Sequence, residues 1–302
     1  MFHAFHGAAD VIGTGLLSTA SIENEISALC ASLSGPAGLM DAVRYALSGG
    51  KRIRPVLSLS VCEDLGGNSS DLLPAAIALE VLHAASLVHD DLPGLDNDDM
   101  RRGQPSCHKK FGEATAILAG DYMISLAFRA VQRSSCSTQI KLTMQEVLSD
   151  AFADLCCGQQ LDLAPPEFRG DIRRLHELKT GALFSASAAF GALVADLPKE
   201  GISCAGQLGK SIGLAFQVVD DYLDVFGSDA VRGRKESSDI RNNKPTFFNS
   251  ADKQTGLAFL RSTQKEIDHL VGALGAFATT GTPAMQRTRD VVGSIFDRLP
   301  PA

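Results

Sequence analysis

Apolar residues recur at helical spacing along most of the chain, and this pattern predicts an all-α protein. In 75–88 the apolar positions leave almost no polar face, so we expect this helix to lie at the centre of the molecule. No segment shows the sustained period-two alternation that is typical of a half-buried strand. Four more segments have the helical spacing and are long enough to cross a bundle: 114–133, 144–163, 171–195 and 203–226.

Proline and glycine separate these segments, for example in GPAG at 35–38 and PP at 165–166. The most polar stretch, 227–247, is predicted to be a loop. A length of 302 residues allows one large domain or two ordinary ones, but no repeat or low-complexity stretch divides the chain. We therefore expect a single domain, residues 1–302, folded as a large helical bundle.

The composition is that of a protein with a sizeable core, because 45% of the residues are apolar and 21% are charged. The formal net charge of −7 disfavours a general nucleic-acid binder, although an anion could still bind in a locally basic pocket. Seven cysteines without a CxxC pair favour reduced thiols over a zinc site or a disulfide framework. These features favour a cytoplasmic protein without a nucleic-acid partner.

The N-terminal stretch MFHAFHGAADVIGTGLL has no lysine or arginine, which argues against a signal peptide and against an arginine-rich transit peptide. The longest apolar region, LLPAAIALEVLHAASLV, spans 17 residues but carries Glu80 and His83. We therefore interpret it as a buried helix and expect no membrane span.

A dense acidic segment, HDDLPGLDNDD at 89–99, follows directly on the most apolar helix. Acidic groups at the C-terminal end of a helix oppose its macrodipole, so Asp90 and Asp91 need a compensating cation. One candidate is the adjacent pair Arg101 and Arg102, and the other is a metal ion.

A second acidic cluster lies in FQVVDDYLDVFG at 216–227, on another apolar helix. Asp220 and Asp224 are one turn apart on one face, and Asp221 lies beside them. Two such clusters facing each other across a bundle would repel, and divalent cations would relieve this repulsion. Mg²⁺ prefers carboxylate oxygens and completes its octahedron with water and substrate phosphate. The pattern therefore predicts a site for magnesium and a diphosphate.

Basic residues occur in the same loops and at the same helix ends as the aspartates. Guanidinium groups suit bidentate phosphate binding, and lysine supplies a point charge. Metal-bridged carboxylates together with direct basic contacts suggest two phosphate-bearing ligands. The candidates are Lys51, Arg52 and Arg54 in GGKRIRP, Arg101, Arg102, Lys179 in HELKTG, Arg234, Lys235 and Lys244.

The motifs GGKRIRP, HDDLPGLDNDDMRRG, KTG and FQVVDDYLD occur in this order over roughly residues 45 to 250. In this the chain resembles the trans-isoprenyl diphosphate synthase family, and especially its bacterial farnesyl and plant-type geranylgeranyl members, which have two extra residues between the aspartates of the first motif. The resemblance implies an isoprenoid synthase bundle with a central cavity, usually as a homodimer. It also implies the head-to-tail (1'-4) condensation of isopentenyl diphosphate with an allylic diphosphate, dependent on Mg²⁺.

The resemblance assigns roles to individual residues. Thr180 and Gln217 would turn oxygen atoms toward an allylic cation. Arg101, Lys179 and Lys244 would bind the allylic diphosphate, and Lys51, Arg54, His83 and Arg102 would bind isopentenyl diphosphate. Arg234 stands in GRKESSD where the family usually has lysine, and Ser237 where it has glycine, so either Arg234 or Lys235 would reach the diphosphate. The expected magnesium ligands are Asp90, Asp91, Asp96, Asp220, Asp221 and Asp224.

Product length depends, in the family, on residues that close a hydrophobic tunnel along the helix before the first acidic motif. The residue five positions before Asp90 is Ala85, followed by Ser86. The small side chain of Ala85 leaves room and could also allow longer chains. Val81 and Leu82 lie one turn deeper, and Tyr122 or Met123 on the next helix could form the floor instead. We favour the twenty-carbon product, geranylgeranyl diphosphate, with farnesyl diphosphate as the alternative.

Two more remote alternatives stay open at this point. A class I terpene cyclase shares the fold and the aspartate-rich sites but would not need GGKRIRP or His83 for a second diphosphate. A non-catalytic regulatory subunit would be expected to have lost aspartates, whereas both sets are intact here. Consumption of isopentenyl diphosphate by the purified chain would separate these classes.

Overall fold

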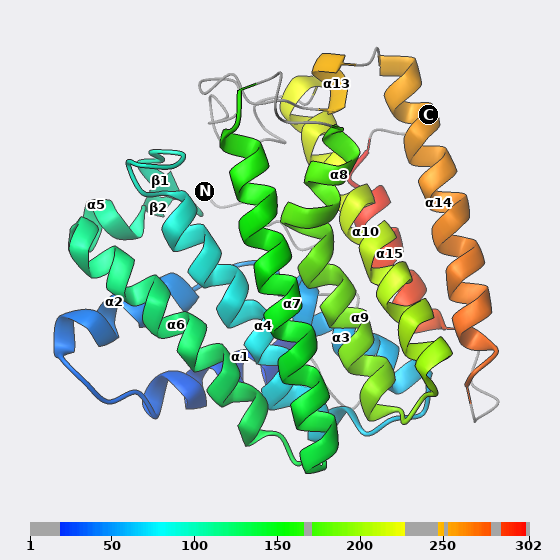
Figure 1. Cartoon of the computed structure of the whole chain (residues 1–302), viewed down its shortest axis with the longest axis horizontal. Coiled ribbons are helices and arrows are strands. Elements are labelled where there is room, and N and C mark those ends of the chain that lie inside the picture. The colour runs from blue at the N-terminus through cyan, green and yellow to red at the C-terminus, as the bar shows by residue number, and fades with distance from the viewer. Residues whose placement is uncertain (1–18, 166–170, 227–246, 251–252, 279–284, 300–302) are drawn as a thin grey trace.

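Helix α4 (Ser69–Asp90) runs through the middle of a helical bundle, as the pattern of 75–88 predicts (Figure 1). The computed structural model describes residues 19–165, 171–226, 247–250, 253–278 and 285–299. The helices that pack most closely on α4 are α3 (Ile53–Asp64), α6 (Glu113–Arg133) and α9 (Ala182–Val194). The other helices are α1 (Thr19–Ala31), α2 (Ala37–Leu47), α5 (Cys107–Phe111), α7 (Thr138–Leu163), α8 (Ile172–His176), α10 (Lys199–Phe226), α13 (Phe247–Ser250), α14 (Lys253–Gly275) and α15 (Gln286–Phe296).

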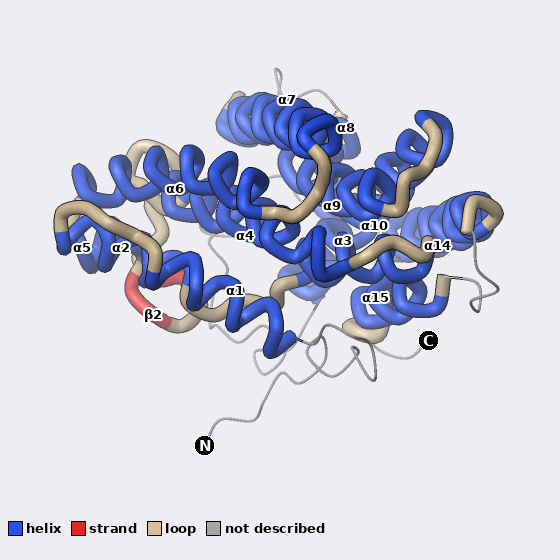
Figure 2. Tube along the Cα trace, turned by 90° about the horizontal axis from the view of Figure 1, so that it is seen from below, coloured by secondary structure: helices blue, strands red, loops and turns tan. Residues whose placement is uncertain are grey.

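The bundle has an inner group and an outer group of helices. Seen from below, α3, α4 and α9 lie in the interior, while α6, α7, α10, α14 and α15 surround them (Figure 2). Leu79 and Leu82 of α4 and Phe184 and Phe190 of α9 are fully buried between these layers. The expected all-α fold is therefore confirmed, and the nearly unbroken apolar surface of α4 is explained by neighbours on every side.

Helices α4, α7 and α10 begin four to six residues before the apolar pattern predicts. Their first turns are polar, with Ser69 and Ser70 opening α4 and Thr138 opening α7. In α4 and α7 these turns are stabilised by side-chain caps, since Asn68 accepts a hydrogen bond from the Ser70 amide and Ser137 from the Ile140 amide. Because these turns are polar, apolar periodicity does not reveal them.

The predicted helix 171–195 is divided into three consecutive pieces. Between α8 and α9 lies a π-helix, Glu177–Gly181, which contains the KTG motif. Two glycines allow it to fit between its neighbours: a Cβ at Gly158 of α7 would collide with the backbone of Lys179, and one at Gly213 of α10 would lie 2.8 Å from Gly181 Cα. Short π-helical insertions occur often at functional sites.

A two-residue hairpin departs from the all-helical expectation. Strands β1 (Met100–Arg101) and β2 (Gln104–Pro105) pair antiparallel directly after the first acidic segment. The hairpin is too short to give a period-two signal. At the other end of the polar stretch 227–247, Phe247 opens α13, whereas 227–246 lie outside the described residues.

Two of the described helices, α4 and α6, are long and apolar enough to cross a membrane by length and composition alone. The core helix of a globular bundle passes the same test, and α4 is enclosed by other helices along most of its length.

The last helix is anchored to the core at its first turn. Asp64, at the end of α3, accepts hydrogen bonds from the Thr288 amide and hydroxyl, both at 2.8 Å. Arg287 Nε lies 2.8 Å from Glu63 Oε2. An acidic group at a helix N-terminus also interacts favourably with the macrodipole. Helix α15 therefore runs from a fixed point toward Arg298, which lies in the active-site region described below.

Candidate active site

The first acidic cluster is a compact turn on the end of α4. Asp90 is the last residue of the helix, and the chain folds back so that the Asp96 amide donates to the Asp90 carbonyl at 2.8 Å. The Asp98 amide donates to the Asp91 carbonyl at 3.2 Å. All four side chains are buried. The turn gathers their carboxylates at one end of the bundle.

Arg101 supplies the local counter-charge that the sequence predicts for this cluster. Its Nε lies 3.0 and 3.2 Å from the two oxygens of Asp91, and its Nη2 also pairs with Asp91 and lies 3.4 Å from Asp98. Burial raises the pKa of Asp91, and the contact with Arg101 opposes this rise. The arginine therefore offsets part of the cost of burying this carboxylate.

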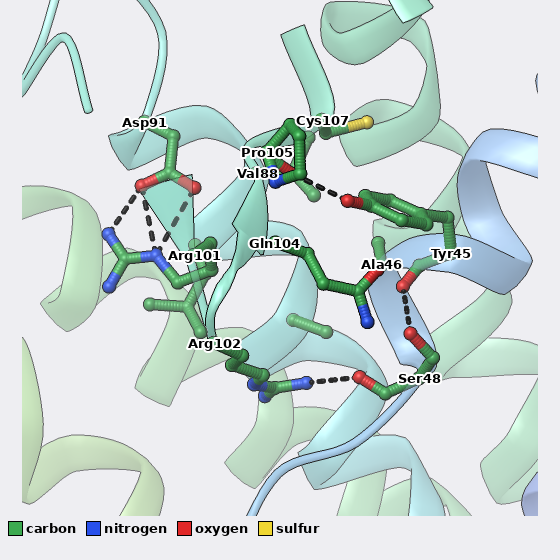
Figure 3. Close-up of a pocket in the computed structure, with 12 residues that line it drawn as sticks. Tyr45, Ala46, Ser48, Val88, Asp91, Arg101, Arg102, Gln104, Pro105 and Cys107 are labelled. Carbon is green, nitrogen blue, oxygen red and sulfur yellow. Dashed lines mark hydrogen bonds and ion pairs between the residues drawn. The ribbon is translucent and has the colours of Figure 1, made fainter. Parts of the chain in front are cut away.

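The hairpin that carries Arg101 and Arg102 is fastened to α2. The Tyr45 hydroxyl donates to the Pro105 carbonyl at 2.6 Å (Figure 3). Arg102 Nη1 donates to the carbonyls of Ser48 and Gly49 at 3.0 and 2.8 Å. These contacts bring the arginines predicted to bind the two diphosphates to the wall of one pocket, between α2, α4 and the hairpin.

Glu80 of α4 supplies a negative charge beside the basic residues of GGKRIRP. Arg52 Nη1 donates to Glu80 Oε1 at 2.9 Å, and Arg102 Nη2 lies 3.7 Å from the same oxygen. Arg52 also bonds Glu23 of α1, so it stabilises the fold. Arg54 is buried, and burial lowers its pKa to about 10; Glu80 and Asp220 oppose this lowering, whereas Arg102 adds to it. Arg54 therefore interacts electrostatically with both the hairpin and the second acidic cluster.

His83 faces this group of arginines. Burial is the main cause that lowers its pKa well below the usual value, and Arg54, Arg102, Arg101 and Arg52 lower it further. The imidazole is therefore neutral at physiological pH and can serve a phosphate as a hydrogen-bond donor rather than as a charge.

The second acidic cluster lies on α10, and its two neighbouring aspartates have different surroundings. Asp220 forms an ion pair with Arg298, which follows α15. Asp221 is buried and accepts three contacts: Gln217 Nε2 donates to Oδ1 at 2.9 Å, the Phe247 amide donates to Oδ2 at 2.7 Å, and His176 Nε2 lies 3.2 Å from Oδ2. Asp221 thus joins α8, α10 and the start of α13.

The π-helix brings Lys179 and Thr180 to the same region. Thr180 Oγ1 donates to Gln217 Oε1 at 2.9 Å, so the two oxygens predicted to face an allylic cation lie together. Lys179 Nζ lies 2.5 Å from Asp162 Oδ2 of α7. The predicted site residues of three helices, α4, α10 and the α8–α9 unit, thus converge at one end of the bundle (Figure 1).

Four residues of the site receive no role in the sequence analysis, although His176 opens the quoted motif HELKTG: Glu80, Asp162, His176 and Arg298. Glu80 and Asp162 carry a signal that could have been used, because each is a charge on a largely apolar helix. His176 and Arg298 carry no such signal, since their partners Asp221 and Asp220 are 45 and 78 residues away.

The donor set fits magnesium bound together with phosphate. In the part of the chain that the structure describes, no group of three or more acidic, histidine or cysteine side chains could hold a metal ion by itself. Mg²⁺ normally takes one or two carboxylates and fills its shell with water and substrate phosphates. The buried carboxylates after α4 and the partly exposed Asp220 of α10, with cations nearby, suit that arrangement. Asp90 at the end of α4 and Asp96 in the following turn would hold it on one side, and Asp220 of α10 on the other.

The residues predicted to set product length lie in the core. Leu82 and Ala85 are fully buried, and the Ser86 hydroxyl donates back to the His83 carbonyl at 2.8 Å. Tyr122 of α6 is half-buried against the same cluster. Arg234, Lys235 and Lys244 lie outside the described residues, and Asp224 is half-buried one turn after Asp220.

Comparison with known proteins gives consistent results. Residues 36–264 match the model of the family described as Polyprenyl synthetase. The farnesyl diphosphate synthase of Micrococcus luteus is 42% identical over 215 residues, covering 69% of this chain and 74% of that protein. The geranylgeranyl diphosphate synthase of Cyanophora paradoxa is 39% identical over 222 residues, covering 70% and 74%.

A solved structure is similar over nearly the whole chain. The geranyltransferase of Helicobacter pylori, crystallised with magnesium and isoprenyl diphosphate, has a TM-score of 0.76 at 26% sequence identity. The match covers 94% of this chain and 100% of that one.

Proposed function

The chain belongs to the polyprenyl synthetase family and is a prenyltransferase that elongates prenyl chains, and on this premise we propose that it joins isopentenyl diphosphate to an allylic diphosphate with the help of Mg²⁺. The observation that carries the proposal is that two acidic clusters, after α4 and on α10, each pair with an arginine and are linked electrostatically by Arg54. Arg54, which interacts electrostatically with both Arg102 and Asp220, forms that link.

One diphosphate must stay on its substrate and the other must leave, and we assign the basic residues to the two diphosphates accordingly. Lys51, Arg54, His83 and Arg102 would bind isopentenyl diphosphate, which must keep its diphosphate. Arg101 and Lys179, with Lys244 of the undescribed stretch, would bind the allylic diphosphate beside Asp90 and Asp96. Magnesium, when bound, would neutralise the departing diphosphate.

The chemistry then needs little from side chains beyond charge and orientation. The allylic C–O bond breaks, and its electron pair leaves with the diphosphate. Thr180 Oγ1 and Gln217 Oε1 turn their dipoles toward the resulting cation, and Asp221 fixes the Gln217 amide that does so. The double bond of isopentenyl diphosphate attacks the cation, and the proton released passes to the departing diphosphate.

We propose geranylgeranyl diphosphate as the product, with farnesyl diphosphate as the alternative. Ala85 has the smallest side chain that could stand at the tunnel floor, which favours the longer product. Relatives with either name resemble this chain about equally, at 42% and 39% identity, so similarity does not choose between them.

The test is a product-length assay with Mg²⁺, isopentenyl diphosphate and, in separate reactions, dimethylallyl, geranyl and farnesyl diphosphate. We expect wild type to extend farnesyl diphosphate to twenty carbons and Ala85→Tyr to stop at fifteen. A wild type that stops at fifteen carbons establishes the farnesyl alternative and points to Tyr122 as the floor. No elongation from any substrate contradicts the proposal and favours the cyclase or the regulatory subunit.

We also propose that the partner of the chain is a second copy of itself. Helix α6 leaves Ile117 and Leu118 exposed by 46% and 57%, and Leu142 of α7 by 51%, which is a large apolar exposure for neighbouring helices. Sedimentation velocity should show a dimer, and Leu118→Glu should shift it toward the monomer. A wild-type monomer at micromolar concentration contradicts this part of the proposal.

A further inference from the structure

The start of α13 is attached to α10 through two neighbouring residues. The Phe247 amide donates a hydrogen bond to Asp221 Oδ2 at 2.7 Å. The next residue, Phe248, packs its ring edge to face on Tyr222, the residue after Asp221, with ring centroids 5.6 Å apart. The placement of the Phe248 ring therefore fixes where the neighbouring amide lies relative to the carboxylate.

Phe248 belongs to an aromatic cluster, which we define as Tyr222, Phe226 and Phe248. The ring of Phe226 lies 5.5 Å from that of Phe248 at an interplanar angle of 86°, and the rings of Tyr222 and Phe226 are 5.2 Å apart. The Phe248 residue is only 7% exposed. Edge-to-face contacts orient aromatic rings as well as stabilising them, so the aromatic cluster gives the Phe248 ring a defined position against α10.

Gly256 of α14 provides the space that the Phe248 ring occupies. A Cβ at Gly256 would overlap this ring and lie 2.6 Å from its Cζ atom, whereas a Cβ at Gly272 of the same helix would meet no atom within 4 Å. A glycine inside a helix lowers its stability relative to alanine. The contact with Phe248 therefore explains why this buried position of α14 carries a glycine.

Asp221 carries the placement of α13 toward the reacting centre. Its Oδ1 accepts a hydrogen bond from Gln217 Nε2 at 2.9 Å, and Gln217 Oε1 accepts one from Thr180 Oγ1 at 2.9 Å. The Phe247 amide and His176 Nε2 lie 2.7 and 3.2 Å from the other oxygen, Oδ2. Loss of the shorter of these two contacts would let the carboxylate turn, and the Gln217 amide would turn with it.

We propose that Phe248, packed against Gly256, is a positioning residue for the condensation. Through the Phe247 amide it orients Asp221, which keeps the Gln217 oxygen directed at the allylic cation. Because this oxygen acts on the cation and not on the bound substrates, the contribution of Phe248 appears in kcat and not in KM. The inference rests on the proposed function for the identity of the cation.

The first test needs no turnover and follows hydrogen exchange at the Phe247 amide, by NMR of protein labelled with ¹⁵N-phenylalanine. In wild type the bond to Asp221 should protect this amide from exchange. Gly256→Ala displaces the Phe248 ring and should speed the exchange about tenfold or more, because a hydrogen bond to a charged group is lost. The matched control is Gly272→Ala, the same change at an exposed position of α14, which should leave the exchange rate within about twofold of wild type.

The second test separates kcat from KM. Gly256→Ala should lower kcat about fivefold and change the KM for either diphosphate by less than about twofold. Phe248→Leu stays apolar but loses the ring, so it should act in the same direction. It carries both tests if circular dichroism shows that Gly256→Ala does not fold. Gly272→Ala should match wild type in both constants.

A double-mutant cycle distinguishes positioning from a general loss of stability. In a Gln217→Leu background the oxygen that Asp221 directs is absent, so adding Gly256→Ala should change the remaining kcat by less than about twofold. Radiolabelled isopentenyl diphosphate makes this low rate measurable. A variant that acts only by weakening the fold would lower kcat by the same factor in both backgrounds.

Unchanged exchange at the Phe247 amide in Gly256→Ala overturns the inference. An unchanged kcat, a rise in KM alone, or an equal loss of kcat in the two backgrounds overturns it as well. If wild type condenses no substrates, the proposed function fails, while hydrogen exchange still reports whether Phe248 holds the Phe247 amide on Asp221. The two failures are therefore distinguishable.

Discussion

In each acidic cluster an arginine pairs with one aspartate of the adjacent pair, but the two clusters differ in where that arginine comes from and in which aspartate it pairs with. At the end of α4, Arg101 comes from ten residues away and takes Asp91, the second aspartate of its pair. On α10, Arg298 comes from 78 residues away and takes Asp220, the first of its pair. The α4 cluster is therefore completed by its own loop, whereas the α10 cluster is assembled from distant segments.

This difference separates the roles of adjacent aspartates. Arg101 pairs with Asp91, whereas the turn after α4 is closed by the backbone hydrogen bond from Asp96 to Asp90. On α10, Asp221 is held by Gln217, His176 and the Phe247 amide, and Asp220 is the one paired with an arginine. The two arginines thus pair with opposite members of the two aspartate pairs, Asp91 in the first and Asp220 in the second.

The largest expected effect comes from removing the first aspartate of either pair. Asp90→Asn and Asp220→Asn should each lower kcat by about a hundredfold or more, because metal-assisted charge stabilisation is worth several kcal/mol. Steady-state rates at saturating Mg²⁺ provide the measurement. The control is Asp99→Asn, whose side chain is 63% exposed beside Lys109, and it should stay within about twofold of wild type. A loss below about tenfold in either variant would remove that residue from the metal site.

Asp221→Asn should show that the neighbour of Asp220 acts through Gln217. Asparagine cannot accept from Gln217, His176 and the Phe247 amide at once, so we expect kcat to fall about tenfold. The magnesium concentration for half-maximal rate should stay within about twofold, unlike that of Asp220→Asn. A magnesium requirement that rises as much as in Asp220→Asn would instead make Asp221 a ligand.

Arg101→Lys tests the role of the arginine that pairs with Asp91 in the first cluster. Lysine keeps the charge but cannot reproduce the paired contacts with Asp91, so the KM for the allylic diphosphate should rise about tenfold. Urea unfolding should show a loss of about 1 kcal/mol, discounted because the Arg101 side chain is partly exposed. If the KM for isopentenyl diphosphate rises instead, Arg101 serves the other substrate.

The smallest effect is expected at His83, which faces the cations between the clusters. Its pKa is lowered, so it is uncharged above pH 6.5 and its ionisation should not alter the KM for isopentenyl diphosphate between pH 6.5 and 8. His83→Gln keeps a neutral donor and should change this KM by less than about threefold. A wild-type KM that rises steeply as the pH increases through 6.5, and does not in the variant, would show that His83 binds as a cation.

The parts of this arrangement that are local in sequence were predictable. Apolar spacing locates the helices, and the return of the chain after Pro93 and Gly94 brings Arg101 to Asp91. The pairs Asp220–Arg298, Asp221–His176 and Asp162–Lys179 were not predictable, because no periodicity links residues on separate helices. The same limit applies to helix starts, where polar caps replace burial, and to the π-helix, which breaks the 3.6-residue period without a glycine or proline at its start.

The π-helix Glu177–Gly181 also makes the site depend on the number of residues and not only on their identity. A π-turn accommodates one residue more than an α-turn, and each residue of an α-helix advances the side chains by about 100°. Loss of one residue here would restore an unbroken α-helix and rotate His176 away from Asp221 relative to α9. A scan of single-residue deletions across 177–181 would therefore expose a constraint that substitution at any one of these positions leaves hidden.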